Sequence, residues 1–192
     1  MHKIFNIFLI ATVVSISGCM SDMPTNVQAI NGLDAQQYLG TWYEIARFDH
    51  SFERGLEQVT ATYSKREDGG IKVINRGYNP QTKQWKEAEG KAYFTEPMNQ
   101  DGTYIGKLKV SFFGPFYGAY HIIELDKTFY NYALVSSGKD YLWILSRTPQ
   151  LTYPIKQELM SKAKALGYPT EQLIFVKQAN QIEYEFGKHV IH

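Results

Sequence analysis

Most of the chain beyond residue 32 consists of short runs rich in aromatic and β-branched residues, and turn-forming residues separate these runs. This pattern is typical of strands joined by hairpins, and it differs from an alternation of strands with helices. Eight strands are predicted, over residues 42–48, 58–66, 71–78, 85–94, 104–113, 117–125, 129–136 and 141–147. Because short turns join neighbours in sequence, we expect an all-β fold, an eight-stranded antiparallel up-and-down β-barrel.

Polar and apolar residues alternate within these runs, which places them on opposite faces of a strand. In the run 104–113, Lys107 and Lys109 alternate with apolar residues, so a charged outer face opposes an apolar inner face. In the middle of the run 85–94, Ala88, Gly90 and Ala92 share one face, and all three are small. Small inward side chains leave space, and we therefore expect an internal cavity instead of an interior that side chains fill.

One α-helix is predicted after the strands. Its apolar positions at helical spacing are Ile155, Leu159, Ala163 and Leu166, with Pro154 in the opening turn and Gly167 at the end. The last two predicted strands are apolar on both faces, so we expect the helix to pack on the outside of the barrel and cover them. The alternative, a membrane-binding stripe, is disfavoured because the stripe is narrow. A final apolar run at 173–177 is a candidate strand beside the helix.

The N-terminal segment has a different pattern. A mostly apolar run at 4–16 follows Lys3 and leads to the only cysteine of the chain, Cys19. This order is typical of a secretory signal, and the run is too short to span a bilayer core of about 30 Å. The residues Ile-Ser-Gly-Cys at 16–19 resemble a bacterial lipobox, which implies that Cys19 carries a lipid. The alternative is an ordinary signal peptide whose cleavage region contains a cysteine.

These observations divide the chain into four parts. Residues 1–18 form a lipoprotein signal peptide, 19–32 the lipidated cysteine and a polar tether, 33–178 the barrel domain with its helix and final strand, and 179–192 a tail. Because Met20, and not aspartate, follows the cysteine, the lipobox resemblance implies the outer membrane. The barrel domain would then lie in the periplasm.

The charge of the chain excludes one class of partner. Lysine and arginine together number 20, aspartate and glutamate 19, and the basic residues form no dense cluster. Proteins that bind nucleic acid gain most of their affinity by neutralising phosphates with such clusters. We therefore expect no nucleic-acid partner.

Several motifs of the barrel region resemble those of the lipocalin family. Gly40 and Trp42 form the Gly-x-Trp at the start of the first strand, and Arg147 ends the last predicted strand in "LSRTP". The segments "NRGYNP", "GKAYF" and "KVSFFGPFYG" look like those of bacterial outer-membrane lipocalins. One motif departs from the family, since Asn131 in "FYNYALV" stands where aspartate is expected. The resemblance implies that Arg147 packs over the Trp42 indole at the closed end, a pairing worth about 0.5–2 kcal/mol.

The resemblance also sets the phase of the strands, because the motif tryptophan points into the barrel. Strand alternation then predicts a ligand pocket lined by Glu44, Ala46, Ala61, Tyr63, Val73, Asn75, Ala88, Gly90, Ala92, Leu108, Val110, Phe112, Tyr120, Ile122, Ala133, Val135, Tyr141 and Trp143. Such a lining suits an acyl chain whose polar head lies toward the mouth. The family implies fatty acids or lysophospholipids as ligands, and a homodimer is a further possibility by analogy.

Two other functions can be weighed on the same barrel. A lipid-modifying enzyme would need a nucleophile, but the chain has no Gly-x-Ser-x-Gly motif and no thiol other than Cys19. A haem-binding lipocalin could use His121, although alternation places this residue on the outer face. His189 and His192 form an H-x-x-H pattern in the tail, which is an incidental pattern in a frayed terminus more often than a metal site. We expect no catalytic residue, no metal and no cofactor.

Overall fold

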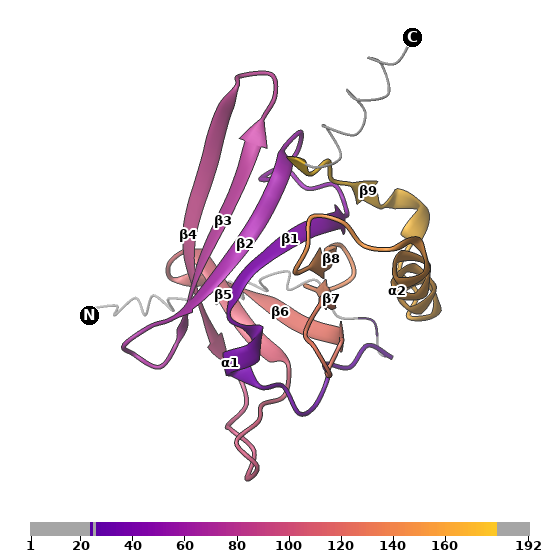
Figure 1. The fold of residues 1–192 in the computed structure, drawn as a ribbon. Helices are drawn as coiled ribbons and strands as arrows, with labels where there is room; N and C mark the ends of the chain where they lie inside the picture. The colour runs from indigo at the N-terminus through magenta and orange to yellow at the C-terminus, as the bar shows by residue number, and fades with distance from the viewer. Residues whose placement is uncertain (1–23, 25, 180–192) are drawn as a thin grey trace, which may run out of the picture.

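The computed structural model describes residue 24 and residues 26–179, whose arrangement Figure 1 shows. The barrel strands are β1 (Gly40–Arg47), β2 (Glu57–Lys65), β3 (Ile71–Asn79), β4 (Gln84–Phe94), β5 (Lys107–Phe113), β6 (Phe116–Leu125), β7 (Tyr132–Ser136) and β8 (Leu142–Ser146). Each strand pairs antiparallel with its neighbours in sequence, and β1 pairs with both β2 and β8, so the sheet closes on itself. The predicted eight-stranded up-and-down barrel is confirmed. The proposed signal peptide, Cys19, His189 and His192 lie outside the described residues.

The strand predicted at 129–136 begins later, at Tyr132. The reason is a turn organised by Asp126, whose carboxylate accepts hydrogen bonds from the backbone N–H groups of Thr128, Phe129 and Asn131. Such bonds offer the backbone an alternative to the strand ladder. The prediction included Phe129 in the strand because this residue is apolar. In the structure Phe129 lies in the turn, and its side chain is 74% exposed.

A short helix that the sequence did not indicate precedes the first strand. Helix α1 (Ala35–Tyr38) is capped by Asp34, whose carboxylate accepts hydrogen bonds from the backbone N–H groups of Gln36 and Gln37 at 2.8 and 3.3 Å. The residue before the cap, Leu33, forms an isolated antiparallel bridge with Tyr104. These contacts fasten α1 across one end of the barrel (Figure 1).

The predicted C-terminal helix is present as α2 (Tyr153–Ala165) and lies outside the barrel (Figure 1). Leu159 and Ala163 of α2 are buried against a cluster that includes Leu134 and Ile144 from the outer faces of β7 and β8. A 3-10 turn, η1 (Thr170–Gln172), leads to β9 (Ile174–Phe175), which pairs with β1. Among residue 24 and residues 26–179, no helix has the length and apolar character that crossing a membrane requires.

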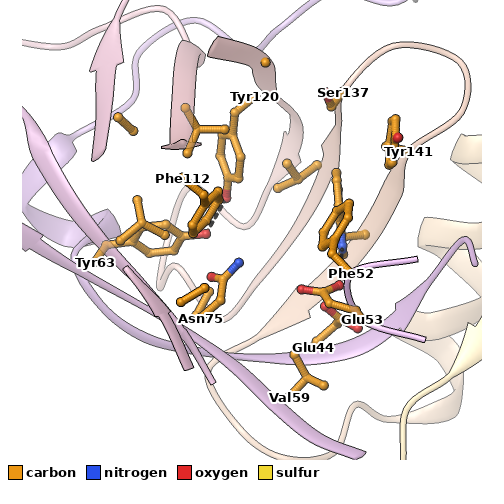
Figure 2. Close-up of a pocket in the computed structure, with 18 of the residues that line it drawn as sticks. Glu44, Phe52, Glu53, Val59, Tyr63, Asn75, Phe112, Tyr120, Ser137 and Tyr141 are labelled. Atoms are coloured by element: carbon orange, nitrogen blue, oxygen red, sulfur yellow. Dashed lines mark hydrogen bonds between the residues drawn. The ribbon is translucent and has the colours of Figure 1, made fainter. Parts of the chain in front are cut away.

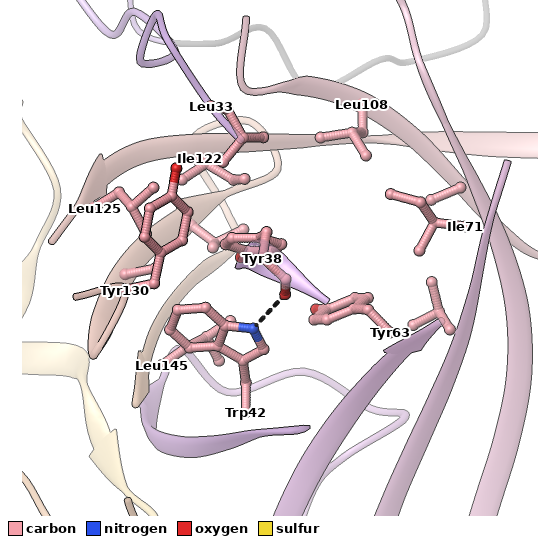
Figure 3. Close-up of a cluster of buried hydrophobic side chains, with 14 residues drawn as sticks. Leu33, Tyr38, Trp42, Tyr63, Ile71, Leu108, Ile122, Leu125, Tyr130 and Leu145 are labelled. Atoms are coloured by element: carbon pink, nitrogen blue, oxygen red, sulfur yellow. Dashed lines mark hydrogen bonds between the residues drawn. The ribbon is translucent and has the colours of Figure 1, made fainter. Parts of the chain in front are cut away.

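A second core fills the inside of the barrel at the end that α1 covers. Figure 3 shows this cluster, in which the indole of Trp42 lies close to Tyr38 and Leu145. Trp42 is fully buried, and its Nε1 donates a hydrogen bond of 2.9 Å to the backbone carbonyl of Tyr38. Tightly packed side chains and α1 thus close this end.

Strand β1 contains an irregularity that affects the pocket prediction. Its pairing with β8 shifts register between Glu44 and Ala46, as expected for a β-bulge. The bulge breaks the alternation, so that Ile45 and Ala46 both join the outer cluster beneath α2. The prediction that Ala46 faces the cavity is therefore wrong, because strict alternation does not continue past a bulge.

Candidate functional site

The closed end of the barrel is held by one arginine. The guanidinium carbon of Arg147 lies 3.9 Å from the centroid of the Trp42 ring, the arrangement that the motifs imply. Its nitrogens also donate hydrogen bonds to the backbone carbonyls of Gln37, Leu39, Thr41 and Tyr130, at 2.6, 2.8, 3.0 and 3.3 Å respectively. Arg147 therefore ties α1, β1 and the β6–β7 turn together.

Gly40 makes this arrangement possible. Its φ of +95° lies in a region that glycine adopts far more readily than other residues, and a Cβ at this position would lie 3.3 Å from the Arg147 Nη1. The glycine of the Gly-x-Trp motif thus serves both the backbone turn into β1 and the close approach of the arginine.

Above this floor, the barrel encloses a cavity of about 660 Å³. A cavity of this size lies within the range for small-molecule sites, roughly 300–1,000 Å³. Of the residues predicted from alternation, those that line it are Glu44, Ala61, Tyr63, Val73, Asn75, Ala88, Ala92, Leu108, Val110, Phe112, Tyr120, Val135, Tyr141 and Trp143. Figure 2 shows several of these side chains pointing into the space from different strands. The lining is predominantly apolar and aromatic.

Three further predicted residues do not line the cavity, although alternation directs them inward. Ile122 and Ala133 are fully buried in the core at the closed end, where no space remains. Gly90 is covered by a neighbour, because a Cβ built on it would lie 2.8 Å from ring atoms of Phe112. Alternation predicts which face of a strand a residue occupies, but not how deep in the barrel it lies or whether a neighbouring side chain covers it. The prediction of these three as pocket residues is therefore wrong.

Further lining residues come from other strand positions, and from connections and the strand ends beside them. The β1–β2 connection contributes Phe52, Glu53 and Leu56, and the β5–β6 hairpin contributes Phe113 and Phe116. Phe113 and Phe116 flank the hairpin turn and are 82% and 79% exposed. For Phe52, Phe113 and Phe116, the sequence signal is an aromatic residue in or beside a turn-like segment.

A buried polar cluster interrupts the apolar wall where the β1–β2 connection meets β1. Arg47 Nη1 donates to Glu44 Oε1 at 2.6 Å, and Nη2 donates to the backbone carbonyl of Glu53 at 2.8 Å. His50 Nε2 lies 3.1 Å from the Glu53 carboxylate, and Trp143 Nε1 donates to it at 3.4 Å. All five side chains except Trp143 are at least nine-tenths buried. Glu44 and Glu53 line the cavity (Figure 2), whereas Arg47 and His50 are not among the lining residues.

The two carboxyl groups differ in protonation. Burial and the negative charge of Glu53 raise the pKa of Glu44 well above its usual value, and Arg47 offsets only part of this. Burial also raises the pKa of Glu53, but the nearby His50 side chain and the charge of Arg47 outweigh it, so the pKa ends below its usual value. Glu53 is therefore the ionised member of the pair, and Glu44 the member that takes up a proton more easily.

A second polar group lies at the deep end of the cavity. The hydroxyl of Tyr120 lies 2.8 Å from that of Tyr38 and 2.9 Å from that of Tyr63. All three tyrosines line the cavity, and Figure 2 shows the hydroxyls of Tyr63 and Tyr120 meeting. Burial raises the pKa of each phenol, so all three keep their protons at neutral pH.

His121, the candidate haem ligand, does not belong to the cavity wall. It is half-buried, and burial together with the nearby Lys107 lowers its pKa. In the described part of the chain, no three His, Cys, Asp or Glu side chains gather closely enough to hold a metal ion. A ligand held inside the barrel would therefore not contact His121.

Comparison with known proteins gives consistent results. Residues 33–178 match the family profile described as "Lipocalin-like domain". The chain is 54% identical over 155 residues to the outer membrane lipoprotein Blc of Citrobacter freundii, covering 81% of this chain and 85% of that protein. It is 51% identical over 173 residues to the protein of the same name from Vibrio cholerae, covering 90% and 98%. The fold resembles that of insecticyanin from the tobacco hornworm, with a TM-score of 0.64 at 19% identity, covering 82% and 87%.

Proposed function

This chain belongs to the lipocalin family, and from that premise we propose that it is a lipid-anchored outer-membrane protein that holds fatty acids or lysophospholipids in its barrel. It would store or carry these lipids within the cell envelope, as a binding protein and not as an enzyme. The observation that carries the proposal is the cavity of about 660 Å³ with its mainly apolar lining.

The chemistry of the cavity supports an acyl chain as the ligand. Alanine, valine, leucine and aromatic side chains from most of the barrel strands face the space. Burying the chain against them would contribute roughly 25 cal/mol for each Å² of apolar surface, before the costs of association. The open end carries polar side chains, including Arg76, Lys86 and Glu87, beside which a polar head could remain in contact with water.

The outer-membrane location is supported by two independent observations. The Citrobacter and Vibrio relatives are named outer membrane lipoproteins. The residues Ile-Ser-Gly-Cys at 16–19 resemble a lipobox, which supports Cys19 as the lipid-bearing first residue of the mature chain. Lipid on Cys19 would anchor the barrel domain through the tether, because two or more acyl chains attach a protein stably to a membrane.

Filling the cavity tests the proposed ligand class. Ala61 lines the cavity from β2, whereas the side chain of the next residue, Thr62, hydrogen-bonds Thr41 on the exposed face. We expect Ala61→Phe to weaken binding of palmitic acid and of a palmitoyl lysophospholipid by at least about 10-fold, because the added ring occupies the space of the acyl chain. The matched control Thr62→Phe should bind as the wild type does. Isothermal titration calorimetry measures both, and equal affinities for the two variants would argue against the barrel interior as the site.

Replacing the cysteine tests the anchor. In Cys19→Ser, no thiol is left for lipid attachment, so we expect the protein to move from the membrane pellet to the soluble periplasmic fraction. Metabolic labelling with a radioactive fatty acid should mark the wild type and not the variant. Membrane retention of unlabelled Cys19→Ser would contradict the proposed anchor.

A further inference from the structure

The three tyrosines at the deep end of the cavity have more donors than partners. Tyr38, Tyr63 and Tyr120 together carry three phenolic protons, and the two close contacts between their oxygens use two of them. This count holds whichever oxygen donates in each contact. Within the part of the chain that the structure describes, the hydroxyls have no other hydrogen-bond acceptor. One O–H group therefore always remains available to an acceptor from outside the protein.

The three phenols lie at the floor of the cavity, so the free donor belongs to this end of the space. The Tyr38 ring lies 4.8 Å from that of Trp42, which marks the closed end, and 5.6 Å from that of Tyr63. Tyr38 and Tyr63 are at least nine-tenths buried, and their surroundings are the apolar residues of the inner core, such as Leu108 (Figure 3). A donor in such surroundings gains more from an acceptor than it would in water.

We infer that the Tyr38–Tyr63–Tyr120 cluster is a binding subsite for an oxygen atom at the deep end of the ligand. The inference rests on the proposed function and adds a chemical requirement to it, because a plain hydrocarbon end leaves the donor unused. Two kinds of acyl ligand supply such an oxygen: a fatty acid that enters carboxyl first, and a chain that carries a hydroxyl at its far end. An acyl chain with a bulky polar head at the mouth and a methyl group at the floor does not.

Conversion of all three tyrosines to phenylalanine tests the subsite with defined probes. Tyr120→Phe alone would leave the hydroxyls of Tyr38 and Tyr63 free to donate, whereas Tyr38→Phe/Tyr63→Phe/Tyr120→Phe removes every phenolic donor of the cluster and keeps the rings. We expect this variant to bind palmitic acid or 16-hydroxypalmitic acid about 2- to 10-fold more weakly than the wild type, the effect of one hydrogen bond. Binding of palmitoyl lysophosphatidylcholine should not weaken. The control Tyr141→Phe removes a phenol just before β8, at the open end, and should not reproduce this selectivity.

A second measurement reports the contact directly. In the wild type, the infrared carbonyl band of [1-¹³C]palmitic acid should lie at the frequency of a hydrogen-bonded group. If the acid enters carboxyl first, this band should shift in the triple phenylalanine variant, which has no phenolic donor in the cluster. If only 16-hydroxypalmitic acid loses affinity, the oxygen is that of an oxidised chain end. Unchanged affinities for both acids, with an unshifted band, would overturn the inference while leaving lipid binding intact. Failure of the wild type to bind any of the three probes would overturn the proposed function as well.

Discussion

Replacing Arg47 with methionine is expected to lower the free energy of unfolding by about 3–5 kcal/mol, because Arg47 is the buried cation beside two buried carboxyl groups and its removal leaves their negative charge without this compensation. Arg47 is 2% exposed and donates both to Glu44 and to the backbone carbonyl of Glu53. Methionine fills much of the same volume, so the loss would reflect the missing charge and hydrogen bonds, and not a cavity. Urea denaturation followed by tryptophan fluorescence gives the value.

The pH dependence of this variant's stability should show that Glu44 is the group whose charge is left uncompensated. Because the pKa of Glu44 is raised in the folded protein, the folded state binds its proton more tightly than the unfolded state does. Stability from this group is therefore full at acidic pH and falls as the pH rises through the folded pKa. Arg47→Met should accordingly be less destabilised at pH 5 than at pH 8. The double variant Glu44→Gln/Arg47→Met should lose this difference, and an equal difference in both variants would contradict the assignment to Glu44.

The second large effect is expected at the closed end. Arg147→Ala should lower the free energy of unfolding by about 2–4 kcal/mol, because four backbone carbonyls lose their donor and the Trp42 ring loses the cation above it. The change lies far from the polar cluster of Glu44, so its effect should add to that of Arg47→Met. Thermal and urea unfolding measure it.

Arg147→Lys provides the matched control. Lysine keeps the positive charge above the indole, but its single ammonium group cannot reach the four carbonyls that the planar guanidinium serves. We expect it to recover less than half of the loss. Full recovery would mean that charge alone, and not the fork of hydrogen bonds, stabilises this end of the barrel.

The fold could be predicted because strand alternation and turn-forming residues are signals that involve only a few neighbouring residues in the sequence. Alternation placed Ala88 and Val110 on the cavity wall correctly, since both lie in regularly paired stretches. It failed at Ala46, where a bulge shifts the register. No local sequence pattern predicts this bulge, because it arises in the pairing of β1 with β8, a strand that is distant in sequence.

The polar features of the site depend on contacts between residues far apart in sequence. Tyr63 and Tyr120 were both predicted to face inward, but only the closure of the barrel brings their hydroxyls to 2.9 Å. Glu53 lies in a connection whose path over β1 is fixed by the Arg47 side chain. The sequence could therefore indicate an apolar pocket, while the position of its polar groups required the tertiary structure.

The closure of one end by α1, Trp42 and Arg147 has a kinetic consequence. A ligand inside a barrel with one opening enters and leaves by the same route, so an incoming molecule cannot push the resident one out through the other side. Exchange must then wait for spontaneous departure, and its rate at saturating competitor concentration becomes independent of that concentration. A carrier of this kind releases its cargo at a pace determined by the residues at its mouth, and not by the abundance of the lipid that replaces it.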